Sequence, residues 1–300
     1  MLNLCRSRLG RIGTDRTAPG ISFSNFHLAW FTYIGDEEEE FSELIYGTNY
    51  DPFNNGGNAV QAVSTLAAWK GPVFSETLPY GSEEIDESLR WQADYHLQDA
   101  YYLANGAYDY YNPLLTLAQT QTVKQILIEN GAVSISYMAD LQYYNQDTHA
   151  VYCDTFDYAN HGVLIAGWDD NYPKENFSEG CRPENDGAWL VRNSWGTDWD
   201  DDGYFWISYE DKTIDFGPFY KLESKDNYAH NYQYDTLGWA ASIATDDFID
   251  PEKASKSGYM SNIFTAESYE QLEAVSFYTT DAGTEYEISV YTGVNSGQRR

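Results

Sequence analysis

Short apolar runs alternate with polar, turn-forming residues along this chain, and three of the runs lie close together in its second half. They cover 162–168, 188–192 and 203–209, and Gly, Asp or Asn residues bound each of them. Such runs are typical of buried strands, so we predict three neighbouring strands of one sheet. His161 precedes the first run and Asn193 follows the second, which predicts that an imidazole and a carboxamide meet at one edge of the sheet.

Periodic patterns predict further elements around these strands. A short helix is expected after Ser24, a residue suited to the N-cap position. A second helix is expected over 59–70, where apolar residues form one broad face, with Asn58 as its cap and Gly71-Pro72 as its end. The remaining predicted elements are a helix within 84–104, an amphipathic helix over 122–130 and an alternating strand over 132–137.

The pattern changes after about Ser224. Aromatic and β-branched residues there alternate with small polar ones, for example over 272–278 and 286–291, which predicts antiparallel β-sheet. A length of 300 residues is compatible with two domains or one large domain. The change of pattern favours a division near residue 224.

The charge of the chain excludes some classes of partner. Seventeen basic and 47 acidic side chains give a formal net charge of −30, which disfavours binding to nucleic acid and to anionic membrane surfaces. No stretch is apolar and long enough for a membrane span, and the first thirty residues lack the pattern of a signal peptide. The acidity and the many Tyr and Trp residues favour a secreted or cell-surface protein.

The three cysteines, Cys5, Cys153 and Cys181, are too few for a disulfide scaffold. Cys153 and Cys181 flank His161 and could form a disulfide with each other. The alternative is two free, partly buried thiols, because sequence spacing alone does not fix the distance between the two Cα atoms.

His161 and Asn193 are residue types that can activate a nucleophile. A thiol becomes reactive when a neighbouring histidine takes its proton, and an amide oxygen can fix the tautomer of that imidazole without adding a full charge. The pair therefore has the chemistry of a general base and its orienting partner. The alternative is a structural strand-end histidine and an asparagine in a turn.

The segment 193–204 reads Asn-Ser-Trp-Gly-Thr-Asp-Trp-Asp-Asp-Asp-Gly-Tyr, which resembles the N-S-W-G-x-x-W-x-x-x-G-Y signature of papain-like cysteine peptidases. His161-Gly-Val resembles the strand-opening histidine of that family, and the segment from Ser24 is similar to its bacterial, clostridial-type members. The resemblance implies a two-lobed α+β fold and a cysteine-type endopeptidase. It makes His161 the base and later the acid, Asn193 its orienting partner, and Trp195 the cover of their hydrogen bond.

The resemblance also implies a set of substrate-binding residues for a peptide or protein substrate. Gly56 and Gly57 would form a strand edge along the cleft, where the absence of side chains lets a substrate backbone approach. Val133 and Gly162 would line the pocket for the side chain two residues before the cleaved bond. The alternative for the paired glycines is a simple turn before the following helix.

The nucleophile is the part of the signature that is missing. The family places its cysteine at the start of a long apolar helix, after a glutamine, in a context such as C-W-A-F, whereas Cys5 is followed by Arg-Ser-Arg and preceded by no glutamine. We therefore expect a fragment that lacks the nucleophile, with Cys5 as the weaker candidate. The alternative is a non-catalytic pseudopeptidase that acts as a surface adhesion or carbohydrate-binding protein.

The expected organisation is a papain-like peptidase domain over 1–224, in which 1–20 are atypical, and a partial lectin-like β-sandwich over 225–300. The second domain makes a carbohydrate or the cell wall a candidate partner. We expect no cofactor and no metal. The acidic run 36–40 is interpreted as a solvated loop, and the acids of 198–202 as a tight turn at Asp202-Gly203.

Overall fold

The computed structural model describes residues 22–33, 52–53, 56–102, 117–155, 157–233, 258–277, 279 and 283–293. Its main feature is a seven-stranded sheet with the order β3-β4-β7-β6-β5-β2-β8. The strands are β2 (Val133–Tyr137), β3 (Tyr144–Asn145), β4 (Ala150–Val151), β5 (His161–Asp169), β6 (Ala188–Arg192), β7 (Tyr204–Ser208) and β8 (Asp215–Phe216). The three predicted strands are thus the adjacent strands β5, β6 and β7, and the strand expected over 132–137 is β2.

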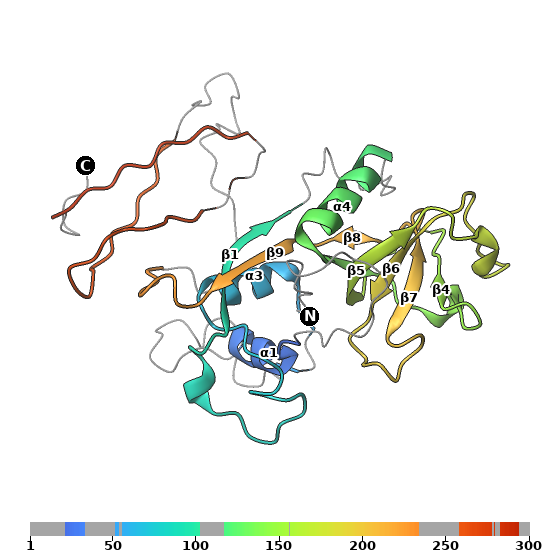
Figure 1. Cartoon of the computed structure of the whole chain (residues 1–300), viewed down its shortest axis with the longest axis horizontal. Coiled ribbons are helices and arrows are strands. Elements are labelled where there is room, and N and C mark those ends of the chain that lie inside the picture. The colour runs from blue at the N-terminus through green and yellow to red at the C-terminus, as the bar shows by residue number, and fades with distance from the viewer. Residues whose placement is uncertain are drawn as a thin grey trace, which may run out of the picture.

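The sheet carries the larger hydrophobic core. β5 pairs antiparallel with both β6 and β2, and buried side chains from these strands pack together with those of β7. The predicted amphipathic helix is α4 (Leu117–Asn130), which contributes the fully buried Val123 and Leu127 to this core. Figure 1 shows α4 lying beside the sheet strands. β5 therefore lies between two paired strands and contacts α4.

The first lobe is built from α1 (Asn25–Tyr33), α3 (Ala59–Ala67) and a two-stranded sheet of β1 (Tyr95–Tyr101) and β9 (Phe219–Ser224). Both predicted N-caps are confirmed. Ser24 Oγ accepts the His27 N–H at 2.9 Å, and Asn58 forms a reciprocal capping box with Gln61. Short 3-10 helices occur at Glu87–Leu89, Leu141–Tyr143 and Lys174–Asn176.

The helix predicted within 84–104 is wrong. The described residues of that stretch form a 3-10 turn at Glu87–Leu89, a loop and then β1, which pairs antiparallel with β9 from Tyr95 opposite Ser224 to Tyr101 opposite Phe219. The partner strand lies far away in the sequence, so no local pattern could reveal it. Pairing and burial against α3 override the local preference.

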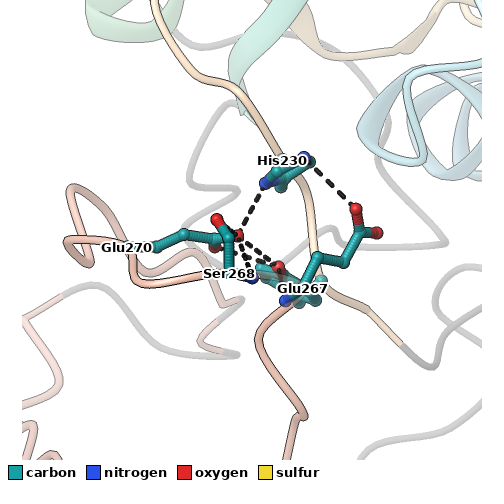
Figure 2. A network of polar contacts seen from close by, with 5 residues as sticks. His230, Glu267, Ser268 and Glu270 are labelled. Carbon is teal, nitrogen blue, oxygen red and sulfur yellow. Dashed lines mark hydrogen bonds and ion pairs between the residues drawn. The ribbon is translucent and has the colours of Figure 1, made fainter.

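Beyond Ser224 the described residues run as extended chain with no assigned strand (Figure 1). The alternating residues of 272–277 and 286–291, for which the sequence predicts antiparallel sheet, form no strand in the part of the chain that the structure describes. One side-chain network links residues 267–270 to His230, in the segment that directly follows β9. His230 lies between Glu267, at 3.3 Å, and Glu270, at 2.9 Å, as Figure 2 shows.

Both described cysteines are free thiols; Cys153 is buried and Cys181 is half-buried, so the structure contains the two-thiol alternative rather than the disulfide. Cys5, the atypical residues 1–20 and the acidic run 36–40 lie outside the described residues. Within the described part of the chain, no helix has the length and apolar character needed to cross a membrane.

Candidate active site

The predicted meeting of His161 and Asn193 takes place. His161 is the first residue of β5 and Asn193 directly follows β6, and the antiparallel pairing of these strands brings both ends to the same edge of the sheet. His161 Nε2 lies 2.9 Å from Asn193 Oδ1. Asn193 is buried, with 1% of its surface exposed, so its side chain is held in one orientation.

The surroundings of Asn193 fix which imidazole nitrogen carries the proton. Asn193 Oδ1 also accepts the Ser194 N–H at 2.8 Å, which identifies this atom as the amide oxygen. His161 Nε2 must therefore donate, and in the neutral ring Nδ1 is left as the basic nitrogen. Asn193 Nδ2 is buried and makes no hydrogen bond with the described part of the chain. The arrangement is that of a general base held by an orienting amide.

Trp195 lies against the imidazole. The two ring centroids are 5.0 Å apart and the ring planes make an angle of 35°. The other side of Trp195 contacts Trp199 edge-on, at 5.0 Å, and Trp199 in turn contacts Phe205 of β7. The indole thus lies against one side of the His161 ring, and the role of Trp195 as cover of the His161–Asn193 hydrogen bond stays a prediction.

Tyr137, the last residue of β2, is the cross-strand partner of His161, and its ring contacts the imidazole edge-on at 6.0 Å. Burial raises the pKa of Tyr137, so its hydroxyl stays neutral. The sequence interpretation did not single out this residue. Its only sequence signal is its place at the end of the predicted strand 132–137, whose register against β5 depends on tertiary pairing.

The predicted substrate-binding glycines, Gly56 and Gly57, lie on the first lobe directly before the capped start of α3. Gly56 O accepts a hydrogen bond from the Tyr33 hydroxyl at 2.8 Å, which ties this backbone to α1. A main-chain role toward a substrate stays a prediction for both glycines.

The predicted pocket residues Val133 and Gly162 are not cross-strand partners. Val133 is fully buried in the core opposite Ile165, whereas Gly162 pairs with Ser136. A Cβ atom placed at Gly162 would meet no atom within 4 Å, so the space beside it is open. The side of β5 at Gly162 therefore has room for a ligand, and a contribution of Val133 to the same pocket stays a prediction.

Neither described cysteine is hydrogen-bonded to His161. Cys153 Sγ contacts Thr155 O at 3.2 Å, and Cys181 Sγ contacts Tyr152 O at 3.1 Å. Burial also raises the pKa of Cys181 to about 11, which disfavours the reactive thiolate. These two residues therefore serve as packed thiols, and Cys5 lies outside the described part of the structure.

Comparison with known protein families matches residues 48–222, more than half of the chain, to the profile "Papain family cysteine protease". The chain belongs to the papain family of cysteine proteases. Residues 231–300 of this papain-family chain match the profile "Lectin like domain". The α+β fold and the combination of a peptidase domain with a lectin-like domain agree with the sequence prediction.

Several relatives resemble parts of this papain-family chain. A cathepsin L-like peptidase of Aedes aegypti is 34% identical over 154 residues, which cover 50% of this chain and 39% of that protein. Procathepsin L of Felis catus is 32% identical over 77 residues, or 25% of this chain and 21% of that protein. The chain therefore spans less than half of either relative.

Among solved structures, the chain is similar to the cysteine protease and lectin-like domains of Cwp84, a surface layer associated protein of Clostridium difficile. The TM-score is 0.54 and the identity 31%, over 69% of this chain and 43% of that one. A clostridial Cwp84 structure after propeptide cleavage gives the same TM-score at 30% identity and covers 69% of this chain and 48% of that chain.

Proposed function

We propose that this chain is the base-bearing part of a cysteine-type endopeptidase. One observation carries the proposal: the His161–Asn193 hydrogen bond at the sheet edge, with Trp195 against the imidazole. It supplies an imidazole with a fixed tautomer, a buried orienting amide and protection from water, as the activation of a thiol requires. Family membership supports the same reaction class.

In the proposed mechanism the nucleophile is a cysteine outside the described residues, either Cys5 or one that this sequence does not contain. His161 Nδ1 takes the thiol proton, and the resulting thiolate attacks the peptide carbonyl to form an acyl-enzyme. The imidazolium then protonates the leaving amine, and the same nitrogen activates the water that hydrolyses the thioester. Asn193 keeps Nδ1 directed at the reacting atoms throughout.

The substrate is proposed to be a peptide or protein that lies along Gly56 and Gly57 in extended form, with one side chain directed toward Gly162 and Val133. The open space beside Gly162 supports this orientation. We place the end of the peptidase domain near residue 224, after β9. A secreted or cell-surface location is proposed because the similar Cwp84 is a surface layer associated protein.

The test is peptide hydrolysis by the full-length product of the native gene, measured with a fluorogenic peptide. His161→Ala should lower kcat/KM about 100-fold or more, since general-base catalysis contributes at least that factor. Asn193→Ala should lower it by less, because the base remains present. His230→Ala, at a histidine of the segment that follows β9, serves as the control with unchanged hydrolysis. Unchanged hydrolysis in His161→Ala would refute the proposal.

A second candidate is a non-catalytic surface protein that binds carbohydrate or cell wall through its C-terminal domain. Two observations favour it: the lectin-like match over 231–300, and the lack of a bond from either described cysteine to His161. Binding to immobilised glycans and to purified cell walls tests this candidate. Glycan binding together with complete absence of hydrolysis by the full-length product would support it over the peptidase.

A further inference from the structure

The loop between β6 and β7, which carries Trp195, contacts the β3–β4 hairpin through the side chains of Asp200 and His149. His149 and Asp200 both have positive φ angles, 53° and 49°, although neither is a glycine. Their side chains meet, with His149 Nδ1 at 2.7 Å from Asp200 Oδ1. His and Asp are among the few side chains that tolerate this backbone region. Because both residues adopt a rare backbone conformation and their side chains contact each other, we interpret the contact as a defined feature of the fold.

Tyr144 completes the cluster. Its hydroxyl donates a hydrogen bond to Asp200 Oδ2 and lies 3.3 Å from His149 Nδ1. Burial and this bond to Asp200 raise the pKa of Tyr144, so the hydroxyl remains a donor. The side chain of Asp200 is only 14% exposed, and its carboxylate accepts from two groups. Tyr144 and His149 belong to the β3–β4 hairpin, whereas Asp200 belongs to the loop between β6 and β7.

A chain of aromatic contacts connects this cluster to the active site. Asp200 directly follows Trp199, whose ring lies 6.4 Å from that of Tyr144 and 5.0 Å from that of Trp195. Trp195 in turn contacts His161 at 5.0 Å. Residues 195–198 are exposed, whereas Trp199 and Asp200 are half-buried and contact the rest of the protein. Asp200, Trp199 and Trp195 thus form a continuous series of contacts that ends at His161.

We propose that Tyr144, His149 and Asp200 form a clamp that holds Trp195 over the His161–Asn193 hydrogen bond. The three residues touch neither substrate nor nucleophile in the proposed mechanism, so they are positioning residues. This inference rests on the proposed function for its catalytic meaning. The clamp itself determines how well the His161 N–H is protected from water, and that protection can be measured without any hydrolysis.

The experiment measures exchange of imidazole N–H protons by NMR on the chain with isotope-labelled histidine. The chain has five histidines, and His161→Gln assigns the signal of interest. In the wild-type chain the His161 Nε2 proton should exchange slowly. Asp200→Gly, which removes both contacts but accepts the positive φ, and His149→Asn should each speed that exchange about tenfold or more, a clear loss of protection.

Two controls separate the clamp from general unfolding. The buried His27 in α1, whose Nε2 lies 2.8 Å from Leu89 O, should keep its exchange rate in every variant. Asp198→Asn, an exposed acid of the same loop, should leave the His161 rate unchanged. Tyr144→Phe keeps the ring beside Trp199 and removes only the hydroxyl, so a smaller acceleration is expected.

The proposal is overturned if the His161 proton of the wild-type chain exchanges as fast as an exposed one, or if its rate stays the same in Asp200→Gly and His149→Asn. If these two variants lose the His27 signal and are therefore unfolded, Tyr144→Phe decides, and an unchanged His161 rate there overturns the clamp. Lack of peptidase activity in the full-length protein would refute the proposed function while leaving these exchange rates as they are.

Discussion

Gly203 and Gly196 offer a matched test of how the active-site loop is packed. Both have positive φ angles, 82° and 87°. A Cβ atom at Gly203 would lie 2.4 Å from the backbone oxygen of Gly196, whereas a Cβ atom at Gly196 would meet nothing within 4 Å. Alanine at either position therefore suffers the same backbone penalty, and only Gly203→Ala adds a clash with main chain.

The magnitudes follow from these contacts. The left-handed conformation costs about 1–2 kcal/mol for a residue with a Cβ atom. At Gly203 the backbone must also move, which weakens the Asn193 N–H bond to Gly203 O at 2.9 Å and the Gly203 N–H bond to Trp199 O at 2.6 Å. With about 1 kcal/mol for each of these two hydrogen bonds, Gly203→Ala should cost about 3.5 kcal/mol and Gly196→Ala about 1.5 kcal/mol.

Thermal unfolding followed by near-ultraviolet circular dichroism measures the difference, because Trp195 and Trp199 belong to the loop concerned. At about 3 °C per kcal/mol for a domain of this size, Tm should fall by about 10 °C in Gly203→Ala and by about 4.5 °C in Gly196→Ala. Because Asn193 is bonded to Gly203, the first substitution should also speed exchange of the His161 imidazole proton. Equal losses of Tm in the two variants would refute the packing argument.

Three further predictions concern other parts of the chain. Asn58→Ala removes the capping box of α3 and should lower the free energy of unfolding by about 1 kcal/mol in urea titrations, whereas an unchanged value would mean that the cap is dispensable. Burial raises the pKa of the fully buried Asp211 to about 6, so the folded chain binds this proton more tightly than the unfolded chain and stability should fall as pH rises between about 4 and 6; Asp211→Asn should flatten that dependence of Tm on pH. Because burial raises the pKa of Cys181 to about 11, alkylation by iodoacetamide near neutral pH should be slower at Cys181 in the folded chain than after unfolding, as peptide mass spectrometry can measure; equal rates would contradict its burial.

The sequence predicted the parts of the fold that depend on local chemistry. Ser24 and Asn58 cap helices because a short polar side chain can reach the free N–H groups of the first turn, which is a property of a few consecutive residues. The active-site pair was predictable for a similar reason. His161 and Asn193 stand at the ends of two adjacent antiparallel strands, so strand assignment alone brings them to one edge.

Features that depend on distant partners were not predictable in the same way. The local pattern predicts helix where β1 forms, because the partner strand β9 lies far along the chain. The contact between His149 and Asp200 depends on the β3–β4 hairpin lying beside the loop after β6, which no spacing in the sequence indicates. The free thiols of Cys153, which follows β4, and of Cys181, in the loop between β5 and β6, likewise depend on where these segments pack.

The pairing of β9 with β1 has a consequence for how this protein can be divided. The peptidase signature ends in β7, yet the strand that covers the backbone of β1 begins only at Phe219 and ends at Ser224. A shortened chain that stops after the signature would leave β1 as an uncovered edge, open to pairing with other molecules and to aggregation. Exchange of the segment that matches the lectin-like profile therefore requires a junction after Ser224, so that β9 stays with β1.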